Sequence, residues 1–478
     1  MKKQGSFMVW TVWILCILSR LPQLLSENLV LDGDECVVAI MAKHIYAGKD
    51  FPLFFYGQQY GFSLVEALMI VPFYAVMCVK AIAVKCAMLL LWSIGVVFLY
   101  KALLQLNKGR AYIPLVLIAL LVLGPAWAVW SMKARGGYLT AFTLSSLLLY
   151  LLTKKDNISG GTWITAGLLL VLVYESMLLW LPGMLLICVY YLYRQKSVAK
   201  TLSFVLPAAL LLIAFHFYRK TLPDFHHPDA TAPMAEWLKN VWRVPQYMYT
   251  SFQGNYFFFD VYPPNFFQSA FAAGFCALVL MAVIGGIICL RKAPFLGVIT
   301  LAILIALGTT ILSPRMHYRY LLPITGYTIL ALQLILNEVR FRKAYSLIAG
   351  AFIVSGIVSV ITFKDFNFTV VKEKSFMKAI RYMERQGIYY TYCHDQYLVW
   401  QLIFYSNEKI LSREMPKGAR YPAYHDEIDA ALNSGKKTAL IGFKDDYFGL
   451  DVQDPVFIDY IYVKENFPKA ELDKNFDF

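Results

Sequence analysis

Three carboxylates stand close together near the start of the chain, at Asp32, Asp34 and Glu35. They follow the first apolar run, a segment of membrane length that carries its positive charge at the far end. Bare carboxylates in or beside hydrocarbon are costly, so this cluster must be solvated, paired with cations or catalytic. The stretch is therefore the first candidate for chemistry.

An aromatic loop follows the acidic cluster. A helix is expected over Cys36–Ala47, and Gly48 ends it. The loop beyond it carries five rings, at Phe51, Phe54, Phe55, Tyr56 and Tyr60. Acids followed by an aromatic platform suit a polar, ringed substrate. The alternative is a solvated loop at the membrane surface.

The composition is that of an integral membrane protein. Of the 478 residues 59% are apolar and only 16% are charged, against roughly 25% charged in ordinary soluble domains. The net charge of +13 could suggest nucleic acid, but the basic residues form small clusters between apolar runs, which is typical of cytoplasmic loops. We therefore expect membrane lipids as partners and no nucleic acid.

Eleven apolar segments are candidates for membrane-spanning helices, and several are shorter than the roughly 20 residues that cross a bilayer. They are Phe7–Ser19, Ile82–Leu104, Ala111–Trp130, Tyr138–Leu152, Ile164–Trp180, Pro182–Leu192, Leu202–Tyr218, Phe267–Leu290, Phe295–Leu312, Tyr320–Leu336 and Ala344–Phe363. A further apolar stretch, Ser63–Val79, contains Glu66 and Pro72.

The charge of the loops indicates whether Ser63–Val79 crosses. If Ser63–Val79 does not cross the membrane, five basic clusters lie on the same side as the N-terminus. If it crosses, all five lie on the outer side. Because basic loops are retained in the cytoplasm, we expect Ser63–Val79 to lie in the outer interface with Glu66 facing water. The prediction is eleven spans in the inner (cytoplasmic) membrane, with the N-terminus cytoplasmic and long outer loops at 25–81 and 219–266.

The composition changes after residue 363. Residues 364–478 are rich in charge and contain no spanning run. Helices are expected over Lys372–Gln386, Gln396–Tyr405 and Asp426–Asn433, and strands over Ile388–Tyr392 and Thr438–Phe443. We therefore divide the chain into a membrane domain, 1–363, and a small exterior, periplasmic α/β domain, 364–478.

The first outer loop carries a recognisable pattern. After the acidic pair Asp34-Glu35 the sequence reads A-x-H-I-x-x-G-x-D-F-P-L-F-x-Y-G-Q-x-Y-G, and later pieces stand at Ala134–Tyr138 and Arg319–Pro323. Residues 1–363 thereby resemble the GT-C superfamily of membrane glycosyltransferases, in the branch of protein O-mannosyltransferases and aminoarabinose transferases. The resemblance implies a polytopic α-helical enzyme that takes a sugar from a polyprenyl-phosphate carrier on the non-cytoplasmic side.

The resemblance also implies roles for the acids. Asp34 matches the superfamily's acidic pair and is the candidate base for the acceptor hydroxyl, with Glu35 beside it in a supporting catalytic role. The alternative for Asp34 is a helix N-cap. No general acid is strictly required, because a lipid phosphate is already a good leaving group.

Several other residues are candidates for binding the substrate. Arg135, Arg315 and Arg319 sit in short outer loops, where positive charge runs against the usual bias, and their guanidinium groups suit a phosphate. The alternative is pairing with lipid headgroups or with the acids. The remaining candidates are Tyr56, Gln58, Tyr60, Tyr320 and the membrane-embedded acid Glu175, for which a hydrogen bond to a neighbouring helix is the alternative.

Metal binding by the histidines and acids is the less favoured interpretation. His226 and His227 are adjacent on the chain and rarely converge on one ion without partners, so a solvated loop is favoured there. The second outer loop, Ser131–Tyr138, adds no carboxylate to the acidic cluster. We therefore expect no metal and no cofactor.

The sequence predicts an inverting, metal-independent glycosyltransferase of the hexosyl or pentosyl type, acting in cell-envelope glycan biosynthesis. Its partners would be a polyprenyl-phosphate-linked sugar donor and a glycan, lipid or protein acceptor. The alternatives are a secondary transporter and a protein that flips or merely binds lipid-linked glycans. The odd number of spans argues against a transporter. So does the position of the polar groups, which are gathered outside the membrane rather than at its middle.

Overall fold

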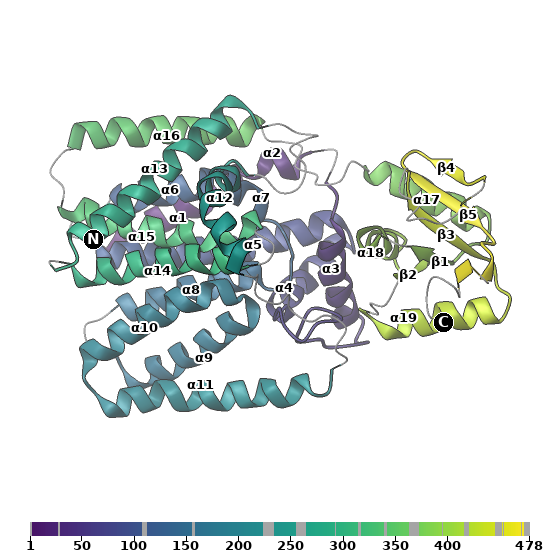
Figure 1. The fold of residues 1–478 in the computed structure, drawn as a ribbon, viewed down its shortest axis with the longest axis horizontal. Helices are drawn as coiled ribbons and strands as arrows, with labels where there is room; N and C mark the ends of the chain where they lie inside the picture. Colours follow the sequence, from purple (N-terminus) through teal and green to yellow (C-terminus); the bar gives the residue numbers. More distant parts are fainter. Residues whose placement is uncertain are drawn as a thin grey trace.

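The computed structural model describes most of the chain. The described residues are 2–26, 29–107, 112–154, 158–222, 234–254, 264–291, 293–313, 317–338, 342–362, 372–393, 395–414, 420–444, 452, 454–469 and 471–472. A bundle of long helices occupies one end of the molecule and a small sheet with its own helices occupies the other (Figure 1).

Every predicted span coincides with a helix of the bundle. These helices are α1 (Lys2–Leu18), α5 (Ala81–Leu106), α6 (Tyr112–Leu123), α8 (Tyr138–Thr153), α9 (Gly160–Ser176), α10 (Leu181–Gln195), α11 (Val198–Arg219), α13 (Phe266–Ile288), α14 (Pro294–Leu312), α15 (Leu322–Glu338) and α16 (Arg342–Thr362). Within the described residues, six helical segments are long and apolar enough to cross a membrane and five apolar helices are shorter. The five include Leu64–Met77, which is not one of the predicted spans, and α10 belongs to neither group. The chain is a multi-pass membrane protein, and the count of eleven crossings stays a prediction.

The predicted span Ala111–Trp130 is wrong in one respect, because it is broken into two helices. The helix α6 ends at Leu123, and α7 (Pro125–Trp130) begins after Gly124. Proline has no N–H for the helical ladder and its ring clashes with the preceding turn, so Pro125 starts a new helix instead of continuing α6. Three short elements, α2 (Leu21–Leu24), η1 (Leu178–Trp180) and η2 (Tyr318–Leu321), and one longer helix, α12 (Met234–Phe252), lie between the bundle helices.

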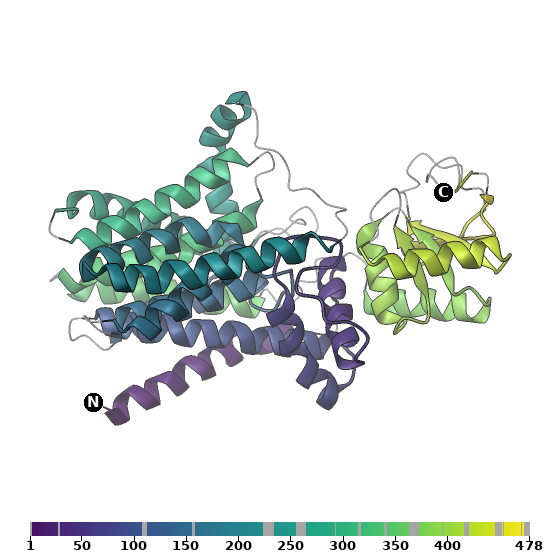
Figure 2. The same ribbon diagram turned by 90° about the horizontal axis from the view of Figure 1, so that it is seen from below.

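The first outer loop contains the helices α3 (Gly33–Tyr46) and α4 (Leu64–Met77). Both lie at the end of the bundle that faces the C-terminal sheet, and the N-terminus lies at the opposite end (Figure 2). At about 1.5 Å per residue, the 14 residues of α4 span about 21 Å, which is less than the roughly 30 Å of a hydrocarbon core. This length fits the expected interfacial position.

The C-terminal region is the predicted α/β unit. Its helices are α17 (Glu373–Arg385), α18 (Gln396–Tyr405) and α19 (Pro422–Asn433), and its strands are β1 (Tyr390–Cys393), β2 (Leu411–Glu414), β3 (Thr438–Phe443), β4 (Val456–Ile458) and β5 (Ile461–Glu465). The strand order is β2-β1-β3-β5-β4. The strand β1 is parallel to β2 and β3, and β5 is antiparallel to β3 and β4. The strands β2, β4 and β5 were not among the predicted elements.

The C-terminal region packs directly on the first outer loop. The Leu31 N–H donates to the Tyr405 hydroxyl at 2.9 Å, and the Gln401 amide donates to the Leu31 carbonyl at 2.8 Å. A Cβ at Gly33 would lie 2.4 Å from the Tyr397 Cα, so the contact with α18 requires glycine there. The start of the acidic cluster is therefore held by both parts of the chain.

Candidate active site

The acidic cluster begins the helix α3. Asp32 is the N-cap: its carboxylate accepts from the Glu35 N–H at 3.0 Å, and the Glu35 carboxylate accepts from the Asp32 N–H at 3.1 Å. This reciprocal capping box satisfies two N–H groups of the first turn. The alternative role of Asp34 as the cap is therefore wrong. Asp34 is the second residue of the helix, and its side chain is available for other contacts.

Two buried lysines neutralise the cap residues. Lys133 lies 2.6 Å from the Asp32 carboxylate, and Lys85 lies 2.5 Å from the Glu35 carboxylate. Burial alone would raise the pKa of Asp32, but the charges of Arg135 and Lys133 reverse this and hold it well below its usual range. Of the three possibilities for the cluster, pairing with cations is the one found for Asp32 and Glu35.

Asp34 lies between two arginines. One carboxylate oxygen is 2.8 Å from Arg135 Nη2, and the other is 3.5 Å from Arg420 Nη2. Arg135 comes from the second outer loop and Arg420 from the C-terminal region, just before α19. The Asp34 side chain is 23% exposed, whereas those of Asp32 and Glu35 are almost fully covered. Asp34 is thus the acid of the cluster that a substrate can reach.

Arg319 extends the positive charge beyond Arg135. Its guanidinium carbon lies 5.5 Å from the ring centre of Tyr138 and 5.7 Å from that of Tyr320. Its Nε is buried without a hydrogen-bond partner among the residues that the structure describes. Tyr138 begins α8, two residues after Gly136, so the second outer loop brings Arg135 and Arg319 to the same region. Arg315 lies outside the described residues.

Glu66 organises the second outer loop, which contradicts the expectation that it faces water. It is fully buried, and its carboxylate accepts from the N–H groups of Gly136, Gly137 and Leu139 at 3.0 to 3.2 Å. The first N–H groups of a helix have no partner within it, and the carboxylate supplies one for α8. This contact fixes the loop from which Arg135 projects.

Replacing Glu66 with Ala should destabilise the protein and abolish its activity. At about 1–3 kcal/mol for each buried donor left unpaired, three donors make the loss about 3 kcal/mol or more. The thermal unfolding of purified protein in lipid measures this change. Glu236→Ala, which removes a half-exposed acid on α12, is the matched control and should shift unfolding little. An unchanged unfolding temperature for Glu66→Ala would contradict the role.

Glu175 and Arg20 make structural contacts. Glu175 pairs with Arg219 of α11, whose Nε also donates to the Gln59 carbonyl at 2.9 Å, so the pair ties the aromatic loop to the bundle. The contact places Glu175 in the helix-to-helix role that was its alternative, and a role in binding stays a prediction. Arg20 is fully buried and donates to the Val122 carbonyl near the end of α6.

The aromatic loop meets the C-terminal region through a buried network. His44 hydrogen-bonds Tyr56 at 2.8 Å through Nδ1 and the Glu408 carboxylate at 3.0 Å through Nε2. Tyr56 in turn donates to Asp50 at 2.9 Å. Tyr56 is therefore a buried link in this contact, whereas Tyr60 is 41% exposed.

Glu414, at the end of β2, introduces a pH dependence. Burial raises its pKa to about 7, opposed by the charge of Arg420. A carboxyl whose folded pKa is raised stabilises the folded state below its unfolded pKa of about 4.5, and this stability is lost as the pH rises through about 7. Glu414→Gln should therefore stabilise the protein at pH 8 relative to wild type, by up to about 2–3 kcal/mol, and change little at pH 4.5.

Unfolding temperatures of Glu414→Gln and wild type at pH 4.5, 6 and 8 measure this effect. The matched control is Glu427→Gln, an exposed acid on α19, which should leave the pH profile unchanged. An equal difference between Glu414→Gln and wild type at all three pH values would contradict the assignment.

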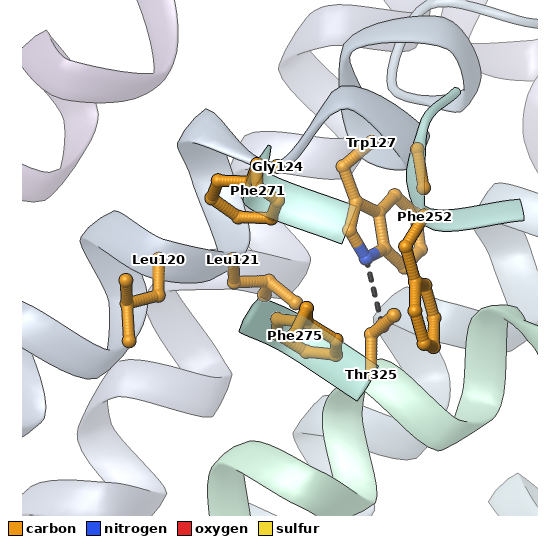
Figure 3. A pocket seen from close by; sticks show the side chains of 9 residues that line it. Leu120, Leu121, Gly124, Trp127, Phe252, Phe271, Phe275 and Thr325 are labelled. Carbon is orange, nitrogen blue, oxygen red and sulfur yellow. Dashed lines mark hydrogen bonds between the residues drawn. The ribbon is translucent and has the colours of Figure 1, made fainter. Parts of the chain in front are cut away.

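Among the described residues, those that line a cavity between the bundle helices include no reactive or charged side chain. It has a volume of about 10 Å³, room for about one water, and is lined by leucine and phenylalanine side chains of α6, α12 and α13 (Figure 3). Its one polar contact is the Trp127 indole N–H, which donates to the Thr325 hydroxyl at 2.9 Å. No group in its lining remains to bind a sugar or a phosphate.

The sequence did not reveal three residues that build the site. Lys85 and Glu66 are single charged residues within apolar helices. An isolated charge in such a helix is energetically costly unless it has a partner, so these two residues could have been recognised in the sequence as members of buried contacts. Arg420 had no such signal, because nothing in the sequence indicated that the C-terminal region reaches Asp34. His226 and His227 lie outside the described residues.

Solved structures share this fold. ArnT from Cupriavidus metallidurans, an aminoarabinose transferase, superposes with a TM-score of 0.63 at 12% identity, over 97% of both chains, and its form bound to undecaprenyl phosphate gives 0.62. The oligosaccharyltransferase AglB from Archaeoglobus fulgidus, with an inhibitory peptide and a dolichol-phosphate, gives 0.55 at 10% identity, over 92% of this chain and 69% of AglB.

The chain has the GT-C fold. The likeness to ArnT extends through the C-terminal region, because it covers nearly the whole of both chains. No protein-family model matches the sequence, and a search of curated proteins finds no match. The resemblance predicted from the first outer loop is confirmed at the level of the fold, and the roles of individual residues stay predictions.

Proposed function

We propose that this GT-C protein is a glycosyltransferase that moves a sugar from a polyprenyl phosphate to an acceptor hydroxyl. The observation that best supports this proposal is the position of Asp34, a partly exposed carboxylate held between Arg135 and Arg420 at the end of the bundle. The ArnT and AglB structures contain undecaprenyl phosphate and dolichol-phosphate respectively, which supports the same class of donor here.

The charge of the cluster favours an anionic donor. Four cations, Lys85, Lys133, Arg135 and Arg420, contact three carboxylates, and Arg319 adds positive charge beyond them. The buried Nε of Arg319 lacks a partner among the described residues, and a phosphate oxygen would supply one. We place the lipid phosphate between Arg135 and Arg319.

The reaction is then a single displacement. The acceptor oxygen attacks the anomeric carbon as its proton passes to the Asp34 carboxylate. The bond from the anomeric carbon to the phosphate oxygen breaks, and its electron pair leaves with the lipid phosphate, which the arginines stabilise. Attack opposite to the leaving group inverts the anomeric configuration.

The three acids of the cluster have cationic partners, so a divalent metal would have to displace a lysine or an arginine to bind them. This supports metal-independent transfer. The N-terminus and the site lie at opposite ends of the bundle, which together with the basic loops supports a site on the non-cytoplasmic face.

The test is transfer by purified protein in lipid nanodiscs with a polyprenyl-phosphate sugar, in the presence of a chelator. Wild type should release lipid phosphate and be unaffected by the chelator. Arg319→Ala should raise the donor concentration needed for half-maximal rate by about 10- to 100-fold, because a charged hydrogen bond is lost. Arg385→Ala, an exposed arginine on α17, is the control. Absence of donor cleavage in wild type would overturn the proposal, and activity restored only by added metal would overturn its metal independence.

A further inference from the structure

A second cavity lies where the aromatic loop meets the C-terminal region. Its volume is about 200 Å³. Residues 50–58 of the first outer loop form one wall, the end of α11 contributes Tyr218, and residues 420–422 close the other side. A Cβ at Gly57 would lie 2.6 Å from the Arg420 Cα, so these walls approach as closely as backbones can.

Arg420 lines this cavity and carries donors that no described residue uses. Only 9% of the residue is exposed, and its guanidinium carbon lies 5.1 Å from the ring centre of Phe55. One nitrogen, Nη2, donates to Gln396 at 2.9 Å and lies 3.5 Å from Asp34. The other two, Nε and Nη1, are buried without a hydrogen-bond partner among the described residues. Buried donors of a charged group are costly to leave unpaired, which points to a ligand.

Arg420 links this cavity to Asp34. Its Oδ2 contacts Arg135, toward Tyr138 and Arg319, and its Oδ1 faces Arg420. If the donor phosphate occupies the arginine side, as the proposed function requires, the acceptor hydroxyl must reach Asp34 from another direction. Arg420, which lines the cavity, faces the other carboxylate oxygen of Asp34.

We propose that this cavity binds one sugar residue of the acceptor, with Arg420 as the residue that positions it. The lining combines aromatic faces, at Phe55 and Tyr56, with the Gln58 amide and the Asp50 carboxylate. Aromatic faces pack against the C–H face of a sugar ring, and the polar groups match its hydroxyls. Pockets for drug-sized ligands measure roughly 300–1,000 Å³, so this smaller volume suits one ring.

A glycan fits these features better than a lipid tail or a peptide. A lipid tail would leave the buried donors of Arg420 unpaired. A peptide segment would need a longer groove than a cavity of this volume. The proposal rests on the proposed function and names the chemical class of the acceptor.

Binding can be measured without a donor. Saturation-transfer NMR on wild type in nanodiscs, with methyl glycosides of glucose, galactose and mannose, should show transfer to at least one glycoside. Arg420→Met should weaken its affinity by about 10- to 100-fold, because charged hydrogen bonds are lost. Gln58→Trp, which fills the cavity from a half-buried loop position, should abolish binding even if Arg420→Met unfolds. Arg385→Met, on the exposed side of α17, should bind as wild type does.

Three results would overturn the inference. The first is a wild type that cleaves the donor but gives no signal with any glycoside. The second is glycoside binding that both cavity variants retain. The third is a short peptide that binds wild type but neither variant, which would make the acceptor a protein. Failure of donor cleavage is a separate readout and would overturn the proposed function instead.

Discussion

Replacing Asp34 with Asn should lower the rate of sugar transfer by about 10²–10⁴-fold and leave the protein folded. The substitution keeps the size of the side chain but removes its capacity to accept a proton. Helix capping is not affected, because Asp32 and Glu35 form the capping box. Initial rates with saturating donor, together with the unfolding temperature, measure both parts of the expectation.

The neighbouring acids are poor controls for this substitution. Asp32 and Glu35 are buried against lysines, so changing either alters the fold of the site as well as its chemistry. Asp426→Asn makes the same chemical change on the exposed face of α19 and should leave the rate unchanged. Near-normal turnover by Asp34→Asn would show that the base lies elsewhere.

The bundle could be predicted because its signals are local. Apolar runs and basic clusters indicate helices and loops wherever they occur, and all predicted spans coincide with helices. The break at Pro125 was also visible in the sequence, since proline rarely continues a helix. The number of crossings depends on segments near the length limit, which a hydropathy pattern alone does not settle.

The centre of the site was less predictable, because its contacts join distant segments. The cluster at Asp34 was found from spacing, but its partners are 101 and 386 residues further along the chain, at Arg135 and Arg420. A cationic side chain carries no sign in the sequence of which acid it will meet. Capping differs because it is local, and the choice between Asp32 and Asp34 depended only on where α3 begins, the least certain feature of a predicted helix.

Replacing Lys85 with Met should destabilise the protein by about 3–5 kcal/mol, the cost of leaving one member of a buried ion pair without its partner. Lys85 and Glu35 are 7% and 1% exposed, so water cannot compensate for the lost charge. Adding Glu35→Gln removes the uncompensated carboxylate, and the double variant should regain most of the lost stability. A double-mutant cycle of unfolding measures the coupling.

The same double variant tests the predicted catalytic role of Glu35. Because both Glu35 oxygens lie near lysines and its side chain is covered, we expect it to support the site rather than exchange protons with the substrate. A stable double variant should therefore keep a measurable part of the transfer rate, in contrast to Asp34→Asn. Lys378→Met, which breaks an exposed pair with Asp459, should cost less than about 1 kcal/mol and serves as the control. A double variant that is stable but as inactive as Asp34→Asn would make Glu35 a catalytic residue. Separately, a Lys85→Met variant as stable as wild type would show that the ion pair of Lys85 and Glu35 does not hold the site together.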